Sequence, residues 1–323
     1  METRWLPDGS PASVSGFSVG QANHPAGPSG VTVVLCPGGA VGGVHLAGSA
    51  PGTRGMDSLR PGHLVRQVHG VLFTGGSSFG LAAVDGALAQ LAAQGVGIDL
   101  GPARLPILPA AVIFDLPLAG GRAVPDAELG RQACLAAGQG PLARGNFGAG
   151  AGATVGKLHG LAQAMKGGVG GAALAVGGLR VGALAVVNAF GDVLDETGAI
   201  LAGARRAPDS REFTGTSAWF LAGGRRLPGQ AAGNTTLAVV TTNARLDRED
   251  ATKVAQLAQH GLVRTIDPVN TTLDGDLVCV LAAGDQEADV NGLGVMAAAA
   301  VARAIRDAVR AAQPLPDLPA AGA

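Results

Sequence analysis

The sequence predicts a layered domain of mixed helix and strand, in the α+β or α/β class. Apolar runs typical of strands alternate unevenly with amphipathic helical segments, and glycine turns between adjacent runs favour antiparallel hairpins. No internal repeat is present, and no Gly-x-Gly-x-x-Gly motif joins a strand to a helix. A doubly wound dinucleotide-binding fold is therefore disfavoured.

Strands are expected where short apolar runs end at turn-forming residues. The runs at 171–176 and 181–188 flank a Gly-Gly turn, as in a hairpin, and the run at 31–35 ends at a Pro-Gly-Gly turn. The expected strands cover residues 31–35, 71–76, 106–116, 171–176, 181–188, 235–243 and 276–284.

Four segments have the apolar spacing of an amphipathic helix. The expected helices cover residues 79–94, 127–137, 247–260 and 290–312. Gly261 is expected to end the third helix, because a glycine directly after an apolar-periodic segment is a typical C-terminal stop.

Two long segments lack any periodicity. Residues 203–231 hold much of the arginine of the chain, and we expect an exposed, mobile segment there. Residues 313–323 are rich in proline and alanine, which predicts a flexible tail. The chain as a whole, 1–323, is expected to form one domain.

Composition disfavours several classes of function. The formal net charge is −1, so nothing draws the chain to nucleic acid or to an acidic membrane surface. Hydrophobic residues make up 47% and charged residues 15%, which indicates surface buried between the subunits of a homo-oligomer. The three cysteines lie far apart, and no signal peptide or membrane-spanning run is visible. We therefore expect a cytoplasmic protein without a metal or cofactor.

A glycine-rich loop at 145–157 resembles a phosphate-binding loop. The positions that need glycine and Ser or Thr hold Ala151 and Leu158, so nucleotide binding is disfavoured.

A second motif, Gly-Ser-Ser-Phe-Gly at 76–80, matches the Gly-x-Ser-x-Gly nucleophile elbow between a strand and a helix. In that interpretation Ser78 is a serine nucleophile that works with His159 or His260. The alternative is that Ser77 or Ser78 caps the helix that follows.

A third motif, Gly-Asn-Thr at 233–235, lies between the non-periodic segment and a predicted strand. A threonine hydroxyl is a weak nucleophile unless a base is adjacent, and an N-terminal threonine supplies its own α-amine, with an ordinary pKa of about 7.7–8.0. Such a terminus arises only when the preceding bond is cut. The sequence therefore suggests that Asn234–Thr235 is a cleavage site and that Thr235 is the nucleophile it exposes.

Four polar residues suit such a nucleophile. Asp274 and Asp276 would point to one face of an extended strand and fix an ammonium group and a hydroxyl, although Asp-Gly is also a turn signal. Asn188 ends a predicted strand, where it serves either as an oxyanion donor or as a turn residue. Lys157 is either a positive charge in the site or a solvated loop lysine.

Taken in order, these segments resemble the family of L-aminopeptidase/D-amidase-esterases, β-aminopeptidases and nylon-oligomer hydrolases. The similarity runs along nearly the whole chain, and the Asn-Thr pair and the Asp-Gly-Asp motif are nearest to the nylon-oligomer hydrolase branch. The similar segments are 29–35, 48–54, 74–86, 109–115, 145–157, 181–193, 233–243 and 267–278.

The resemblance implies an α+β fold, namely a four-layer αββα sandwich of the self-processing N-terminal-nucleophile type. It implies an α chain, 1–234, and a β chain, 235–323, assembled as a homo-oligomer such as a tetramer of processed units. It also gives each candidate residue a role: the nucleophile is Thr235, the oxyanion-hole amide is Asn188, and a lysine of the site is Lys157.

Asp274 and Asp276 match the two residues that orient the nucleophile and its amine. The chain departs from the family at two places. Phe114 stands where members often carry a tyrosine, so it lines the substrate pocket without a phenol. Val112 and Ile113 lie near the position where the aminopeptidase branch has a glutamate that binds the substrate amine, which weakens a strict aminopeptidase assignment.

The function expected from the sequence is thus a self-cleaving N-terminal-threonine amide hydrolase. Its substrates would be small peptides, amino-acid amides or linear oligoamides, with no nucleic acid or membrane partner. Two alternatives stay open at this point: a serine esterase of the α/β-hydrolase type using Ser78, and a non-catalytic small-molecule binding protein.

Overall fold

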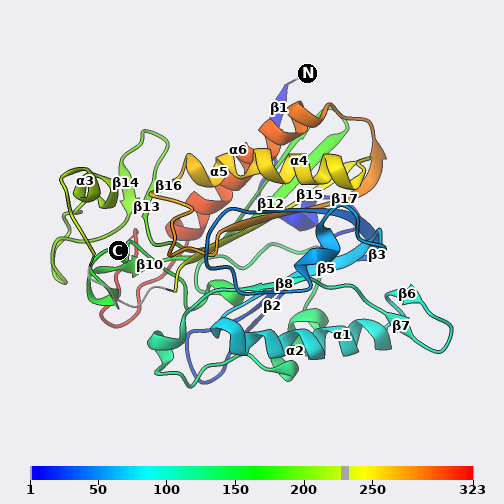
Figure 1. Cartoon of the computed structure of the whole chain (residues 1–323), viewed down its shortest axis with the longest axis horizontal. Coiled ribbons are helices and arrows are strands. Elements are labelled where there is room, and N and C mark those ends of the chain that lie inside the picture. Colours follow the sequence, from blue (N-terminus) through cyan, green and yellow to red (C-terminus); the bar gives the residue numbers. More distant parts are fainter. Residues whose placement is uncertain (1, 227–232, 323) are drawn as a thin grey trace.

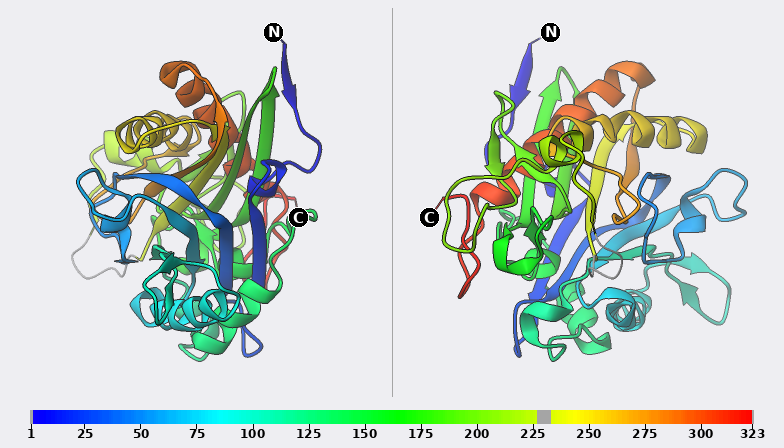
Figure 2. Two further views of the ribbon diagram at one scale, coloured as in Figure 1. Left: turned by 90° about the vertical axis from the view of Figure 1, so that its right-hand side faces the viewer. Right: turned by 60° about the vertical axis from the view of Figure 1, so that its left-hand side comes forward.

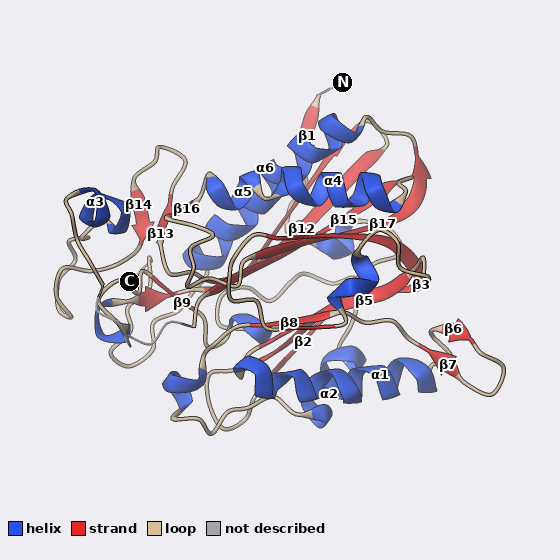
Figure 3. Cartoon of the chain, viewed as in Figure 1, coloured by secondary structure: helices blue, strands red, loops and turns tan. Residues whose placement is uncertain are grey.

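Two mixed sheets lie between two layers of helices in the computed structural model of the chain, which describes residues 2–226 and 233–322 (Figure 1). The α-helices are α1 (Ala83–Ala93), α2 (Ala127–Leu135), α3 (Thr216–Leu221), α4 (Arg248–Ala258), α5 (His260–Val263) and α6 (Val290–Arg310). Figure 3 shows the sheets between the helix layers, and in the turned views of Figure 2 α1 and α2 again lie opposite α4 and α6.

The two sheets share one long strand and form a continuous path in the order β1-β11-β12-β15-β17-β3-β5-β8-β4, with β2 also paired to β3. These strands are β1 (Thr3–Trp5), β2 (Ser18–Asn23), β3 (Gly30–Leu46), β4 (Thr53–Arg54), β5 (Val68–Thr74), β8 (Ala110–Val112), β11 (Gly168–Val176), β12 (Leu179–Asn188), β15 (Thr235–Ala244) and β17 (Leu277–Gln286). Short peripheral strands are β6 (Ile98–Asp99), β7 (Arg104–Leu105), β9 (Thr154–Val155), β10 (Met165–Lys166), β13 (Asp192–Leu194), β14 (Ile200–Ala202) and β16 (Ile266–Asp267).

Strand β3 joins the two sheets because its halves pair with different neighbours. Residues 30–35 pair with β2 and β5, and residues 41–46 pair with β17, with a register shift between Leu35 and Ala40. The sequence predicted a strand end at this Pro-Gly-Gly stretch, but the chain bends there and continues, with Gly39 at a φ of 87°. Glycine tolerates this left-handed conformation, so the stretch acts as a bend within one strand.

The three large hydrophobic cores of the described residues confirm the predicted four layers. One core lies between α4, α6 and the sheet of β11, β12, β15 and β17; a second lies between the two sheets; and a third lies between the other sheet and α1 with α2. Along β15, Ala238 and Val240 belong to the first core, whereas Leu237 and Val239 belong to the second. This alternation is the period of two expected for a strand buried on both faces.

The predicted helices form with shifted ends. The first helix was predicted over 79–94, but residues 79–82 belong to a 3-10 helix, Ser77–Ala82, that precedes α1. Gly261 lies inside α5 rather than ending a helix, so the predicted stop there is wrong. Asp247 is the N-cap of α4, since its carboxylate accepts the Asp250 backbone N–H at 2.8 Å.

Two segments expected to be exposed or flexible are partly packed instead. Within 203–231, Ala204, Arg205 and Thr216 are buried, and the Asp192 carboxylate accepts the Ala204 and Thr216 backbone N–H groups. Residues 227–231 of that prediction lie outside the described residues. In the segment predicted as a flexible tail, Leu318 and Ala320 are buried, whereas Gln313, Pro314 and Gly322 are exposed. No helix in the described ranges is long and apolar enough to cross a membrane.

The contact between α1 and α2 depends on two glycines. A Cβ atom at Gly86 would lie 1.7 Å from the Ala127 carbonyl oxygen, and one at Gly130 would lie 1.8 Å from the Ala83 carbonyl oxygen.

We expect Gly130→Ala to lower the free energy of unfolding by about 1–3 kcal/mol, because backbone atoms must separate to admit the methyl group. Gly140→Ala is the matched control, since nothing lies within 4 Å of its added Cβ. Equal denaturant midpoints for both variants would contradict this view of the helix contact.

Candidate active site

Strand pairing places Asn188 directly opposite Thr235. Asn188 is the last residue of β12 and Thr235 is the first residue of β15, and the two are partners in the antiparallel register. Both are buried, with 0% and 5% of their surface exposed. The sequence identified each residue from its own local motif, and the register now brings them together at one end of the sheet.

The bond before Thr235 is held by two hydrogen bonds to its carbonyl oxygen. The Thr235 hydroxyl donates to the Asn234 carbonyl oxygen at 2.5 Å, and the Gly275 backbone N–H donates to the same oxygen at 2.8 Å. Gly275 has little free space, because a Cβ there would lie 2.8 Å from Thr235 Oγ1. A backbone donor of this kind stabilises negative charge that develops on a carbonyl oxygen.

Asp276 lies beside the start of β15, with both carboxylate oxygens engaged by backbone donors. One oxygen accepts the Thr236 N–H at 2.5 Å, and the other accepts the Asn270 N–H at 2.9 Å. The hydrogen bond to Thr236 therefore holds the Asp276 carboxylate at the residue that directly follows Thr235.

Asp274 is fixed by the loop that precedes it. Its carboxylate accepts the Phe190 N–H at 3.2 Å, the Thr271 N–H at 3.1 Å and the Thr271 hydroxyl at 2.5 Å. Sequence reasoning overlooked Thr271 and the backbone N–H of Gly275. Thr271 belongs to an Asn-Thr-Thr sequence, which has the form of a glycosylation acceptor and does not indicate a catalytic role, and the Gly275 N–H leaves no signal in side-chain identity.

The side chain of Asn188 has a defined orientation. Its Oδ1 accepts the Thr154 N–H at 3.0 Å and the Lys157 ammonium at 2.8 Å. Its Nδ2 group consequently faces two carbonyl oxygens, those of Gly233 at 3.2 Å and Phe114 at 3.3 Å. Asn188 thus presents a donor to the residue before Asn234, while the carbonyl of Asn234 itself is held by Gly275.

Burial and mutual repulsion shift the titration of this cluster. Burial raises the pKa of Asp276 to about 7, and the neighbouring Asp274 carboxylate adds to the rise, against the two backbone donors. Burial also raises the pKa of Asp274. Burial lowers the pKa of the Lys157 ammonium to about 7, although Asp274, Asp276 and Asp115 oppose the change. Pairs of groups with strongly shifted pKa values, such as Asp276 and Lys157, are typical of functional sites.

Two cavities meet at Gly233 and Phe114. One, of about 370 Å³, is lined by Thr235, Asn234 and Ser78 among others. The other, of about 400 Å³, has an apolar wall of Phe114, Pro117, Leu118 and Leu161 and is also lined by the titratable side chains of Asp115, Lys157, His159 and Arg226. A Cβ at Gly233 would lie 2.1 Å from the Phe114 ring, so the chain passes tightly between the two cavities.

The nucleophile-elbow hypothesis for Ser78 fails on geometry. Ser78 is exposed at the rim of the first cavity, and among the described residues no histidine hydrogen bonds to it. His159 contacts the Thr214 hydroxyl at 3.2 Å and packs against Trp219, while His260 lies in α5 on the outer helix layer. A serine–histidine pair is therefore not assembled around Ser78.

No three His, Cys, Asp or Glu side chains in the described parts of the chain form a group suited to a metal ion. The candidate site consists of five side chains and the backbone donors of the loop before β17. The five side chains are those of Thr235, Asn188, Lys157, Asp274 and Asp276.

Comparison with known families and relatives supports the hydrolysis of peptide or amide bonds. The model of Peptidase family S58 matches residues 12–318. An uncharacterized aminopeptidase of Mycobacterium tuberculosis (strain ATCC 25618 / H37Rv) is 41% identical over 313 residues, covering 90% of this chain and 88% of that protein. A 6-aminohexanoate-oligomer endohydrolase of Kocuria sp. (strain KY2) is 31% identical over 265 residues, covering 81% of this chain and 71% of that protein.

Solved structures show the same fold. A β-aminopeptidase of Burkholderia sp. superposes with a TM-score of 0.70 at 22% identity, covering 97% of this chain and 89% of that one. The L-aminopeptidase D-Ala-esterase/amidase of Ochrobactrum anthropi, described as a variant of the Ntn-hydrolase fold, gives a TM-score of 0.70 at 19% identity, covering 97% and 88%. Sequence identity is thus higher to a protein named aminopeptidase, at 41%, than to one named oligomer endohydrolase, at 31%.

The raised pKa of Asp276 makes folding stability depend on pH. Between about pH 4 and pH 7 folded Asp276 keeps a proton that the unfolded chain releases, so the stability present at low pH is lost as pH rises through this window. We expect Asp276→Asn to flatten this decline in the free energy of unfolding. Denaturant titrations across the window measure the slope, with exposed Asp285→Asn as control. A slope unchanged in Asp276→Asn would show that other groups cause the dependence.

Proposed function

Because this chain belongs to peptidase family S58 and is a hydrolase of peptide or amide bonds, we propose that it cuts its own Asn234–Thr235 bond and then uses Thr235 as an N-terminal nucleophile. The observation that carries the proposal is the carbonyl of Asn234, which accepts both the Thr235 hydroxyl and the Gly275 N–H. The nucleophile and an oxyanion donor thus both contact the bond to be cut.

The self-cleavage step follows from these contacts. Thr235 Oγ1 attacks the Asn234 carbonyl carbon, and the Gly275 N–H stabilises the resulting oxyanion. The C–N bond breaks, the Thr235 nitrogen takes the hydroxyl proton, and Asn234 is left as an ester on Oγ1. Water then hydrolyses the ester, which gives Asn234 a free carboxylate and Thr235 a free hydroxyl and amine.

The mature site would act on external amides in the same way. The α-amine of Thr235 has an ordinary pKa of about 7.7–8.0 and serves as the general base for its own hydroxyl. Asp276 and Asp274 lie beside the start of β15, where they hold the amine and the hydroxyl in position. Once Gly233 has left, the Asn188 amide is free to hold the substrate oxyanion together with the Gly275 N–H.

Lys157 has a positioning role in this scheme. It donates to Asn188 Oδ1 at 2.8 Å and to the Asn188 carbonyl oxygen at 3.0 Å, which turns the Asn188 Nδ2 group toward the site. Its ammonium also offsets the charge of the two aspartates.

The apolar wall beside Phe114 favours amides with aliphatic bodies, such as short peptides, amino-acid amides and linear oligoamides. Gly233 lines both cavities, so the acyl side of the cut bond runs from the space at Thr235 into the apolar space beside Phe114. Val112 and Ile113 are buried and apolar near the place where the aminopeptidase branch is expected to carry a glutamate. The homo-oligomer and the cytoplasmic location expected from the sequence stay predictions.

Replacing Thr235 tests the nucleophile. We expect Thr235→Ala to remain a single uncut chain without amidase activity, because no hydroxyl is left to attack the preceding carbonyl. Denaturing mass analysis with N-terminal sequencing should give fragments 1–234 and 235–323 for the unchanged protein and for Thr235→Ser. A cut at this bond in folded Thr235→Ala would overturn the scheme.

Replacing Asn188 separates maturation from turnover. Its amide contacts the Gly233 carbonyl rather than the Asn234 carbonyl in the uncut chain. We therefore expect Asn188→Ala to mature to fragments 1–234 and 235–323, yet to hydrolyse an aminoacyl anilide or an aminohexanoate oligomer about 10²–10³-fold more slowly. If both reactions slow by the same factor, Asn188 acts on the self-cleavage step as well.

A further inference from the structure

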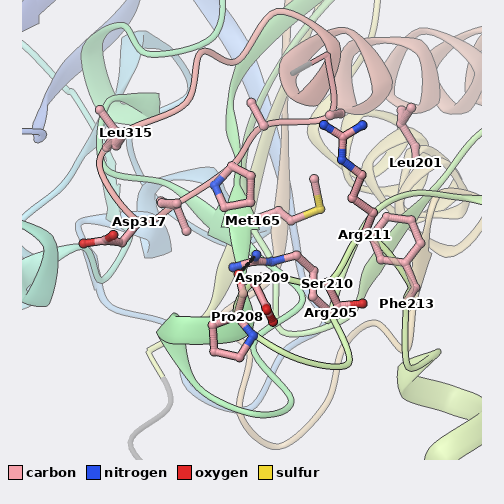
Figure 4. Close-up of a pocket in the computed structure, with 14 residues that line it drawn as sticks. Met165, Leu201, Arg205, Pro208, Asp209, Ser210, Arg211, Phe213, Leu315 and Asp317 are labelled. Carbon is pink, nitrogen blue, oxygen red and sulfur yellow. Dashed lines mark hydrogen bonds between the residues drawn. The ribbon is translucent and has the colours of Figure 1, made fainter.

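A cavity of about 580 Å³ shares no lining residue with the two cavities that meet at Gly233 and Phe114 (Figure 4). Its walls come from three parts of the chain: Met165 of β10, residues 201–213, and the C-terminal segment 315–321. The sequence predicted both longer segments to be exposed or flexible. Their packing against each other is what creates this cavity.

Arg205 is the unusual residue of the cavity. Only 5% of its surface is exposed, and its terminal nitrogens donate to two carbonyl oxygens, those of Pro208 and Ala162. Its Nε is buried without a hydrogen-bond partner, and no carboxylate of a described residue forms an ion pair with it. Burying a guanidinium without an ion pair is costly, and burial accordingly lowers its pKa, with the Asp209 carboxylate opposing the change.

The other charges of the cavity leave room for a small charged ligand. Arg211, Asp209 and Asp317 line it, and none of them forms an ion pair within the described residues. The remaining lining is mostly apolar: Met165, Leu201, Phe213, Leu315, Leu318 and Pro319. Cationic groups beside an apolar wall fit an anion with an aliphatic body.

We propose that this cavity binds a small aliphatic carboxylate, with the carboxylate on Arg205, the positive charge of Arg211 adding attraction from another part of the lining, and the hydrocarbon against the apolar wall. The Nε–H is the guanidinium donor of Arg205 that has no partner, and a carboxylate oxygen would give it a charge-assisted hydrogen bond. Asp209 and Asp317 add a place for an ammonium group, so an amino acid is one form of the ligand and a fatty carboxylate is the other.

The cavity is also tied to the candidate active site through a loop. The Arg205 N–H and guanidinium donate to the carbonyl oxygens of Gln163 and Ala162, both at 2.9 Å. The same loop supplies His159 and Leu161 to the cavity beside Phe114. A carboxylate that holds Arg205 therefore steadies a wall of both cavities. The proposal itself concerns binding and does not rest on the nucleophile.

Calorimetric titration of the whole protein with three probes tests the proposal: hexanoate, 6-aminohexanoate and hexylamine. We expect both carboxylates to bind at one site per chain and hexylamine not to bind over the same concentration range. Tighter binding of 6-aminohexanoate assigns the acidic side chains to an ammonium group, and equal binding assigns the site to the carboxylate alone.

Three variants locate the site. Arg205→Leu should abolish binding, and Arg211→Gln, at an exposed position that can be replaced without unfolding the chain, should weaken it roughly tenfold by loss of a positive charge from the cavity lining. Arg206→Gln is the matched control, because Arg206 is exposed in the same segment but does not line the cavity. Absence of carboxylate binding, equal binding of hexylamine, or affinity unchanged in both Arg205→Leu and Arg211→Gln would overturn the proposal.

Discussion

The candidate site depends on the antiparallel pairing of β12 with β15. This register sets Asn188 opposite Thr235 through backbone hydrogen bonds, and the parallel pairing of β15 with β17 brings the preceding loop alongside. Residues separated by dozens of positions in sequence thereby meet at one end of a sheet that is buried on both faces. A slip of one residue in this register would turn every β15 side chain to the opposite core, so the same hydrophobic burial that stabilises the fold also fixes the position of the nucleophile.

Buried charge is the second constraint on the site. Asp274, Asp276 and Lys157 are tolerated because each is held by backbone groups or by another polar side chain. Their pKa values shift toward neutrality for the same reason, since neither two nearby carboxylates nor a desolvated ammonium retains its ordinary titration. Only 15% of the residues of the chain are charged, yet three charged side chains lie together at the candidate site.

Much of this arrangement was predictable from sequence because the local signals agreed with the global fold. The apolar runs of β12, β15 and β17 and the spacing of α6 were recognisable, and Thr235, Asn188 and Asp274 were picked from motifs. Other features depend on tertiary contacts. The bend in β3 looked like a strand end, because Pro-Gly-Gly is a turn signal unless both flanks find partners. The packing of Leu318 and Arg205 depends on long-range contacts that periodicity does not show. The Gly275 N–H belongs to the backbone, so no residue type marks it.

The contact between Gly233 and Asn188 has a consequence for timing. In the uncut chain the protein's own backbone occupies the amide that would hold a substrate oxyanion. Under the proposed mechanism the newly made chain is thus a zymogen that carries its inhibitor in the same polypeptide. Its activation is a first-order event, independent of protein concentration and of any other protease, and it is irreversible once the released end of the α chain leaves the site.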